Sequence, residues 1–176
     1  MTFDYSPSLT GRVVEVRPLT GADFWELYAV AADPLLWAQH PEPERARLPD
    51  FRRFFDTALD QCALAVRDRR TGALIGSSRF ANHRPDTRTV EIGWTFLARS
   101  HWGGPCNADL KDVMLRHAFN FVDRVVFLVH PANLRSQRAL EKIGAVLLGT
   151  TLEEERKPYL EFEILSDGYA ELATVA

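Results

Sequence analysis

Glu91, a carboxylate inside an otherwise apolar strand, is the side chain best placed for acid–base chemistry. Side chains alternate along a strand, so two faces are expected across 90–97. One face would hold Val90, Ile92, Trp94 and Phe96, and the other Glu91, Gly93, Thr95 and Leu97. Burial would raise the pKa of the Glu91 carboxyl above its free value of about 4.3, which suits a base working near neutrality. The alternative is a structural ion pair with Arg79 or Arg88, because perturbed carboxylates are often only paired.

The loop at 101–107, with the sequence HWGGPCN, could bind a phosphate group. Gly103 and Gly104 let the backbone approach a ligand closely. The helix expected after them would offer free N–H groups and the positive end of its dipole. The pattern is neither GxGxxG nor a phosphate loop that ends in Lys-Ser/Thr. A plain turn before a helix is the alternative.

The stretch 124–150 predicts a strand, a short turn, a helix and a further strand. Asn133 can cap the helix, because its side-chain oxygen can accept a backbone N–H of the first turn. Gly144 lies where a helix must end in a left-handed conformation. Ser136 adds a hydroxyl to the first turn. Taken alone, Asn133 and Ser136 are a helix cap with a polar first turn.

Three further side chains carry chemistry of their own. Cys106 would lie at a helix N-terminus, where a thiolate is favoured, although a small apolar filler is the preferred interpretation. His117 falls in an apolar stripe and is expected to be packed. His83, at a strand end near Asp86, is an alternative base. No His, Cys or Asp spacing indicates a metal site.

These residues require a mixed α/β framework. Apolar periodicity predicts strands at 12–19, 62–68, 73–82, 88–97, 124–129, 144–150 and 159–166. Helices are predicted to begin near 20, 49, 105 and 133, and Pro49 is tolerated at a helix start because its missing N–H costs nothing there. The strand at 124–129 is almost continuously apolar, as expected where helices cover both faces. The predicted order is β-α-α-β-β-β-α-β-α-β-β.

Composition excludes several classes of protein. The chain has 176 residues, which suits one domain across 1–176. A net charge of -3 offers no basic field for DNA or RNA. No apolar run approaches the roughly 20 residues that span a bilayer, and the N-terminus lacks the pattern of a signal peptide. Cys62 and Cys106 show no pairing pattern, so we expect a reduced, cytoplasmic compartment.

Two stretches resemble the GNAT superfamily of acyl-CoA N-acyltransferases. They are VEIGWTFLARSHWGGPCNADLKDVMLRHAF at 90–119 and NLRS followed by ALEKIGA at 133–145. The similarity is sharpest to the branch that acetylates ribosomal-protein N-termini. It implies the GNAT fold, an α/β arrangement with a mixed, mostly antiparallel central sheet and helices on both faces. The element order predicted from periodicity agrees with that fold.

The resemblance also implies a co-substrate, acetyl-CoA, and residues that bind it. Trp102, Gly103, Gly104, Cys106 and Asn107 would form the pyrophosphate loop. Trp102 stands where the family usually has Gln or Arg, and Pro105, which stands for the first glycine of the family pattern, removes one backbone donor. Backbone N–H groups at Phe96 and Leu97 would stabilise the thioester oxyanion. Asn133 and Ser136 would contact the pantetheine arm.

The implied reaction is transfer of an acetyl group to a primary amine, either a protein N-terminus or a small-molecule amine, by direct attack in a ternary complex. Glu91 would be the base. Many members place a tyrosine as general acid at the position of Leu140, so Ser136 is the nearest hydroxyl substitute. Apart from the resemblance, the irregular segment LLWAQHPEPE at 35–44 could cover the acceptor cleft with Trp37 as a wall, the alternative being a surface loop with one anchoring aromatic, and His83 is an alternative acceptor contact. The alternative is a non-catalytic module that binds acyl-CoA or a protein; no metal, nucleic acid or membrane is expected, and the protein would be a monomer or homodimer.

Overall fold

The computed structural model describes residues 2–152 and 158–169. These residues form an eight-stranded sheet in the order β1-β2-β3-β4-β5-β6-β8-β7. Neighbouring strands are antiparallel except β5 and β6, which run parallel. The strands are β1 (Leu9–Thr10), β2 (Val14–Pro18), β3 (Leu64–Asp68), β4 (Leu74–Arg84), β5 (Thr89–Leu97), β6 (Arg124–Val129), β7 (Val146–Leu152) and β8 (Pro158–Leu165). The helices are α1 (Phe24–Ala31), α2 (Leu48–Asp60), α3 (Cys106–Ala118) and α4 (Leu134–Glu141).

The predicted fold class and element order are confirmed, with the short β1 and several 3-10 turns as additions. Pro49 lies in the first turn of α2, and Asn133 caps α4 by accepting a hydrogen bond from the Ser136 backbone N–H at 3.2 Å. Gly144 has a positive φ of 82° just after α4, as a left-handed helix end requires. The apolar stripe of α2 ends before Cys62, which is exposed beyond the helix.

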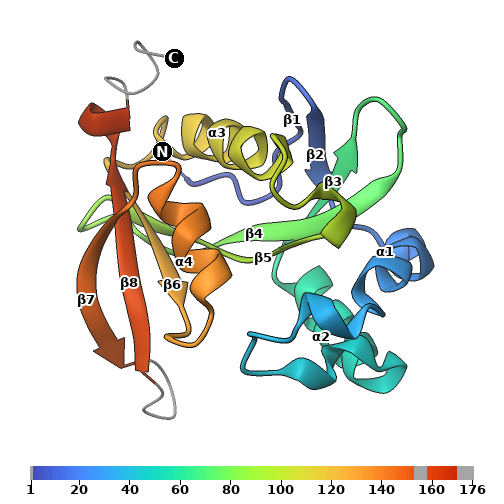
Figure 1. The fold of residues 1–176 in the computed structure, drawn as a ribbon. Coiled ribbons are helices and arrows are strands. Elements are labelled where there is room, and N and C mark those ends of the chain that lie inside the picture. The colour runs from blue at the N-terminus through green and yellow to red at the C-terminus, as the bar shows by residue number, and fades with distance from the viewer. Residues whose placement is uncertain (1, 153–157, 170–176) are drawn as a thin grey trace.

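The sheet separates two apolar clusters, and helices cover both faces (Figure 1). Residues of α3 and the end of α4 pack in one cluster, and residues of α1 and α2 pack in the other. β3 contributes to both by simple alternation: Leu64 and Val66 face the α3 cluster, whereas Ala65 faces the α1 and α2 cluster. The strands that position the site are therefore held from both sides.

A bulge in β5 breaks the predicted alternation of that strand. Gly93 pairs with Arg79 and Phe96 with Ser77, so three steps along β5 oppose two along β4. Trp94, at the bulge, has a positive φ of 51°. Val90, Ile92 and Leu97 consequently lie in the α3 cluster, whereas Phe96 lies in the other. The prediction that Phe96 shares a face with Val90 and Ile92 was wrong, because one extra residue reverses the facing of every later side chain.

The prediction that helices cover both faces of the strand at 124–129 was also wrong. Val125, Phe127 and Val129 are buried in the α3 cluster, whereas the alternate residues of β6 are half-buried. On that second face Arg124 binds Glu161 and Glu163 of β8, at 2.8 and 2.7 Å. The apolar run thus belongs to a strand with one covered face.

The parallel strands β5 and β6 separate after a short paired region. Their pairing covers Thr89 with Arg124, Val90 with Val125, and Glu91 with Val126. Beyond Glu91, β5 pairs with β4 and β6 pairs with β8, and the two inner strand edges diverge. This divergence opens the middle of the sheet, between the start of α3 and the start of α4 (Figure 1).

Candidate functional site

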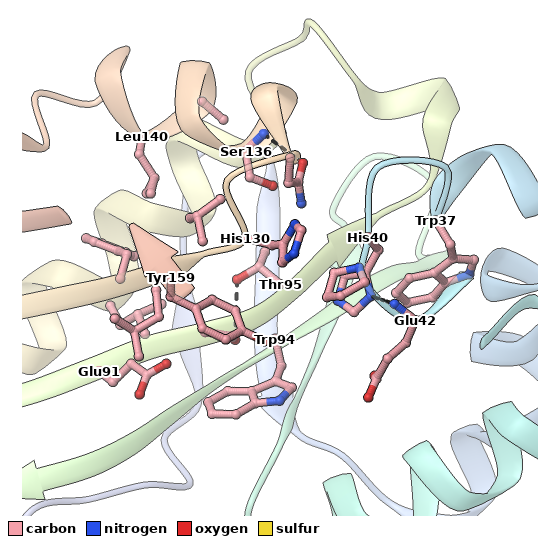
Figure 2. A pocket seen from close by; sticks show the side chains of 18 of the residues that line it. Trp37, His40, Glu42, Glu91, Trp94, Thr95, His130, Ser136, Leu140 and Tyr159 are labelled. Carbon is pink, nitrogen blue, oxygen red and sulfur yellow. Dashed lines mark hydrogen bonds between the residues drawn. The ribbon is translucent and has the colours of Figure 1, made fainter. Parts of the chain in front are cut away.

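A cavity of about 280 Å³ lies where β5 and β6 diverge. Its wall combines β5, β6, the first turns of α3 and α4, the segment after α1, and Tyr159 of β8. Figure 2 shows Glu91, Trp94 and Tyr159 along one side, His40 and Glu42 opposite, and Ser136 and Leu140 at the end nearest α4. The lining residues are Trp37, His40, Pro41, Glu42, Arg45, Glu91, Ile92, Gly93, Trp94, Thr95, Asn107, Lys111, Phe127, Leu128, Val129, His130, Asn133, Ser136, Ala139, Leu140 and Tyr159.

Glu91 lies at the point where the two strands part, and only 4% of it is exposed. The Asn82 side-chain amide donates a 2.7 Å hydrogen bond to its Oε2. The other oxygen, Oε1, lies 3.0 Å from the place where a Cβ on Gly93 would be, so the absence of a side chain at Gly93 makes room for it. Arg88, one of the two partners considered for an ion pair, binds Asp123 instead. The carboxylate therefore lies buried and oriented beside an open space.

Lys111 enters the cavity from α3, and the sequence analysis did not identify it. Its ammonium nitrogen lies 2.7 Å from the Thr95 hydroxyl, which in turn lies 2.7 Å from the Ser78 hydroxyl. Burial lowers the pKa of Lys111 to about 7. The side chain follows Asn107 by one helical turn, so both face the cavity from the same side of α3. This polar chain ties α3 to the bulged part of β5.

The first turns of α4 form the far end of the cavity. Asn133 and Ser136 both line it, and Asn133 also keeps its role as the helix cap. Leu140, one turn further on, lines the cavity with an apolar side chain. The position at which the resemblance implies a tyrosine therefore faces the site but carries no acid.

The loop residues Trp102, Gly103 and Gly104 do not line the cavity. Contacts of Trp102 with β5 and α4 fix the position of the loop. The Trp102 indole N–H donates to the Leu97 carbonyl at 2.9 Å, and the Arg135 guanidinium lies 3.9 Å from the Trp102 ring centroid. A Cβ at Gly103 would meet nothing within 4 Å, and one at Gly104 only the His101 carbonyl at 3.8 Å. The loop thus leaves open space beside the start of α3, as a phosphate-binding loop requires.

Cys106 begins α3 but has the environment of a packed residue. It is buried, and burial, with Asp68 and Asp109 nearby, raises the pKa of its thiol. A raised pKa keeps the thiol neutral and disfavours the nucleophile that its helix position would allow. Asn107, the next residue, lines the cavity instead. The preferred interpretation of Cys106 as a small filler agrees with this surrounding.

Neither Phe96 nor Leu97 is among the residues that line the cavity, but one of the two directs its backbone N–H away from β4. The Ala98 N–H donates to Ile75 on the β4 side at 2.7 Å. Successive N–H groups of a strand point to opposite edges, so the Leu97 N–H points away from β4 and the Phe96 N–H toward it. The Trp102 bond to the Leu97 carbonyl agrees with that direction. Of the two residues predicted to hold an oxyanion, Leu97 is the one so oriented.

The segment between α1 and α2 forms the wall opposite Glu91. Trp37 lines the cavity, but it is buried and its indole N–H donates to the Ala31 carbonyl at 2.8 Å, so its contact with an acceptor stays a prediction. Burial, with Arg45 and other cations nearby, lowers the pKa of His40 to about 3, so this imidazole is neutral at physiological pH. Arg135 of α4 donates to the Leu36 carbonyl at 3.1 Å and thereby joins this wall to the α4 end.

Two further histidines, His83 and His117, lie away from the cavity. The His83 ring packs in a tilted arrangement with its centroid 5.1 Å from that of the Phe3 ring, and it does not line the cavity. The His117 Nε2–H donates to the Asp4 backbone carbonyl at 2.8 Å, and the ring packs against Phe80, as expected of a packed residue. Among residues 2–152 and 158–169, no His, Cys, Asp and Glu group is suited to a metal ion. The helices of this same part of the chain are too short or too polar to cross a bilayer.

Several cavity residues had no clear signal in the sequence. Lys111 interrupts the apolar pattern of α3 one turn after Asn107, and this spacing is the signal that could have been used. Thr95 was identified only as a strand position, and His40, His130 and Tyr159 join the site through tertiary contacts between distant segments. Sequence spacing carries no information on such contacts.

Comparison with known proteins gives one consistent result. A family model for the acetyltransferase (GNAT) domain matches residues 14–146. A GCN5-related N-acetyltransferase from Brucella melitensis superposes with a TM-score of 0.87 at 20% identity, covering 98% of this chain and 85% of that one. A putative acetyltransferase from T. thermophilus has a TM-score of 0.78 at 25% identity, covering 99% of both chains. RimJ from Mycobacterium smegmatis, in complex with CoA-disulfide, has a TM-score of 0.72 at 17% identity, covering 98% of this chain and 94% of that one. No curated protein matches the chain in sequence.

Proposed function

The chain belongs to the GNAT acetyltransferase family, and from this premise we propose that it transfers an acetyl group from acetyl-CoA to a primary amine, a protein N-terminus or a small molecule. One observation carries the proposal. The buried carboxylate of Glu91 lies in the same cavity as the first turns of α3 and α4, at the point where β5 and β6 part. A base and a binding cleft thus meet at one place.

The residues at the two helix starts suit acetyl-CoA. The open space beside Gly103 and Gly104 leaves room for a pyrophosphate, and the first-turn N–H groups of Cys106 and Asn107 can donate to it. Arg135, beside Trp102, adds a positive charge near the same loop. Asn133 and Ser136 line the cavity where the pantetheine arm would pass. When bound, acetyl-CoA supplies an acyl group activated as a thioester.

Glu91 accepts a proton from the acceptor amine, directly or through one water, as the amine nitrogen attacks the thioester carbonyl carbon. The new C–N bond forms while the carbonyl π electrons move to oxygen, and the Leu97 N–H stabilises the negative oxygen. Most of the rate enhancement comes from holding the two reactants together in the cavity. The C–S bond then breaks, and the thiolate takes a proton from water or from the Ser136 hydroxyl, since Leu140 has no acidic group.

The competing function is a module that binds acyl-CoA without turnover. Two features favour it, namely Leu140 at the acid position and Pro105 in the loop. The buried, hydrogen-bonded Glu91 favours the enzyme, because a scaffold that only binds CoA has no use for a carboxylate turned away from the phosphate loop.

Glu91→Gln tests the proposal. The change keeps the size of the side chain and removes the charge that accepts the proton. We expect thiol release with an amine acceptor to fall by about 10²-fold or more, with acetyl-CoA affinity near that of the wild type. Thiol release is followed with a chromogenic disulfide, and affinity by the rise in melting temperature with acetyl-CoA.

Glu15→Gln is the matched control, because Glu15 is an exposed strand glutamate outside the cavity. Equal turnover in Glu91→Gln and wild type would show that Glu91 is only structural. If neither acetyl-CoA nor CoA raises the melting temperature of the wild type at millimolar concentration, the assignment of the co-substrate fails.

A further inference from the structure

Arg79 is a buried cation that lacks a full set of hydrogen-bond acceptors within the described chain. It lies on β4, only 6% of it is exposed, and its guanidinium carbon lies 3.3 Å from the centroid of the Trp94 ring. Within the part of the chain that the structure describes, its buried Nε has no hydrogen-bond partner. A guanidinium carries five N–H donors and is costly to bury when they are unused. The arrangement therefore indicates an acceptor that comes from outside the described residues.

The surroundings of Arg79 lower its pKa, but the guanidinium stays charged. Burial, with the nearby charge of Arg45, lowers the pKa of Arg79 to about 10, and the charge of Glu91 opposes that shift. The guanidinium therefore keeps its proton at neutral pH. Glu91 is a negative charge near Arg79, but it does not accept a hydrogen bond from the Nε, and a bound anion would supply that acceptor.

A second cavity, of about 440 Å³, gives such an anion a place beside Arg79. Its lining includes three arginines and three acids, of which two pairs neutralise each other: Arg45 with Glu42, and Arg53 with Asp50. The third acid, Glu44, is exposed at the surface. Arg79 is thus the buried cation of this cavity whose charge is not matched by a carboxylate ion pair among the described residues.

The second cavity adjoins the first, because Glu42, Arg45 and Trp94 line both. Arg79 pairs with Gly93 across the two strands, and Ala81 pairs with Glu91. The residue pair between them, Phe80 and Ile92, belongs to the α3 cluster, so Arg79 and Glu91 both lie on the opposite face of the sheet. Diagonal neighbours of this kind have backbones about 7–8 Å apart.

We infer that Arg79 binds a carboxylate carried by the acceptor, so that the acceptor is an amine with a carboxylate a few bonds away from its nitrogen. This inference rests on the proposed function. Arg79 would hold the carboxylate over Trp94 while the amine lies beside Glu91. The planar guanidinium matches a carboxylate with two parallel hydrogen bonds.

The charges around Arg79 favour a carboxylate over a phosphate monoester as the bound anion. The lining of the second cavity shows that this anion is not part of acetyl-CoA. One unmatched cation suits a single negative charge, because Arg45 and Arg53 already bind acids. The pyrophosphate loop does not line the second cavity, whose residues come from the segment before α2, from α2 itself, and from β4 and β5. The anion bound by Arg79 is therefore on the acceptor.

A panel of matched amines tests the inference on the full-length protein. Thiol release from acetyl-CoA is measured with glycine, β-alanine and γ-aminobutyrate, with the amide of each, with propylamine and with putrescine. Peptides that begin Ser-Asp or Ser-Asn form a second arm, which distinguishes a carboxylate on a protein N-terminus from one on a free amino acid. In one arm or the other we expect kcat/KM for the carboxylate compound to exceed that for its amide by about tenfold or more.

Arg79→Gln should abolish that preference by raising KM for the carboxylate acceptor much more than KM for propylamine. Arg79→Lys should keep part of it, because an ammonium keeps the charge and loses the paired geometry. Arg53→Gln is the matched control, since Arg53 is an exposed arginine that lines the same cavity and binds Asp50. It should leave the preference unchanged.

The inference would be wrong if the amides, propylamine or putrescine were acetylated as efficiently as the carboxylate amines. It would also be wrong if the preference for carboxylate amines persisted in Arg79→Gln. If Arg79→Gln does not fold, the inference is tested by comparing kcat/KM for the carboxylate amines and their amides in the wild type and in Arg79→Lys. If no acceptor is acetylated, the melting temperature of the CoA-saturated protein decides: a rise with a carboxylate amine that Arg79→Lys weakens supports the inference, and no rise contradicts it. Failure of the proposed function is distinct, because then neither acetyl-CoA binding nor thiol release is seen with any amine.

Discussion

At the scale of single residues, missing groups shape the cavity and its surroundings. Glu91 fits because Gly93 has no side chain, and Leu140 leaves the acid position empty because it has no hydroxyl. Arg79 is buried with an Nε that finds no acceptor among the described residues. Such local mismatches cost stability and are therefore expected at sites that a ligand completes.

The fold disfavours protonation of the buried Lys111, and this predicts a pH-dependent stability. The unfolded chain holds the Lys111 proton up to a pKa of about 10.5, whereas burial lowers the folded value to about 7. The unfolded state therefore binds more protons between these values, so stability rises with pH across this window, and the penalty is complete below pH of about 7.

Lys111→Met removes this penalty, so we expect the variant to be more stable than the wild type at neutral pH. The difference should shrink as the pH rises toward 10, because the wild-type lysine is then neutral in both states. Denaturant midpoints measured across this range check the prediction. Lys142→Met, at an exposed lysine, is the control. A difference between Lys111→Met and wild type that does not vary with pH would contradict the assigned burial.

At the scale of elements, two strands and two helix starts make the site. The pairing of β5 with β6 ends at Glu91, and the bulge at Trp94 redirects the rest of β5. α3 and α4 then present their first turns to the opening. A helix start offers unpaired N–H groups, so the same geometry that ends the strand pairing brings donors to the cleft.

Cys106, at the start of α3, is expected to be dispensable for turnover. Cys106 is buried with a raised pKa, so direct transfer does not need its thiol. We expect turnover within about threefold of the wild type, and a stability loss of no more than about 1 kcal/mol, since only a small group is removed. Turnover and intact mass after incubation with acetyl-CoA are measured. An acetyl adduct that disappears in Cys106→Ala would establish a covalent intermediate and overturn direct attack.

At the scale of the whole molecule, one sheet joins two apolar clusters. β4 contributes Ile75 and Phe80 to the α3 cluster and Leu74 to the α1 and α2 cluster. The strands that carry Glu91 and Arg79 cannot keep their positions unless both clusters are intact. The two clusters are therefore expected to unfold together, as one domain across 1–176 would.

Phe80→Ala and Phe55→Ala test this coupling, because each removes a fully buried ring from a different cluster. We expect each to cost about 3–5 kcal/mol and to shift one common transition. Far-ultraviolet circular dichroism, which follows the sheet and helices, and tryptophan fluorescence, which includes Trp37 of the second cluster, should give the same midpoint. Phe→Leu at each position is the milder control. Separate midpoints for the two probes would show that the clusters unfold independently.

The sequence by itself determined the elements and several roles within them. Apolar periodicity located the strands and helices in the right order, because one face of each had to be buried. Asn133 and Gly144 marked the start and end of α4 through local backbone chemistry that needs no distant partner. The resemblance in 90–145 pointed to Glu91, Asn107 and Ser136, which do line one cavity.

Tertiary structure alone decided the rest. The bulge at Trp94 depends on pairing with β4, so strand alternation could not reveal that Phe96 changes face. The wall made by Trp37 and His40, and the place of Tyr159, depend on contacts between segments that are far apart in the sequence. Whether Lys111 and Arg79 are buried, and whether Arg79 has an acceptor, depends on every group packed around them. Burial and pairing are sums over the whole fold, whereas a sequence pattern records only neighbours along the chain.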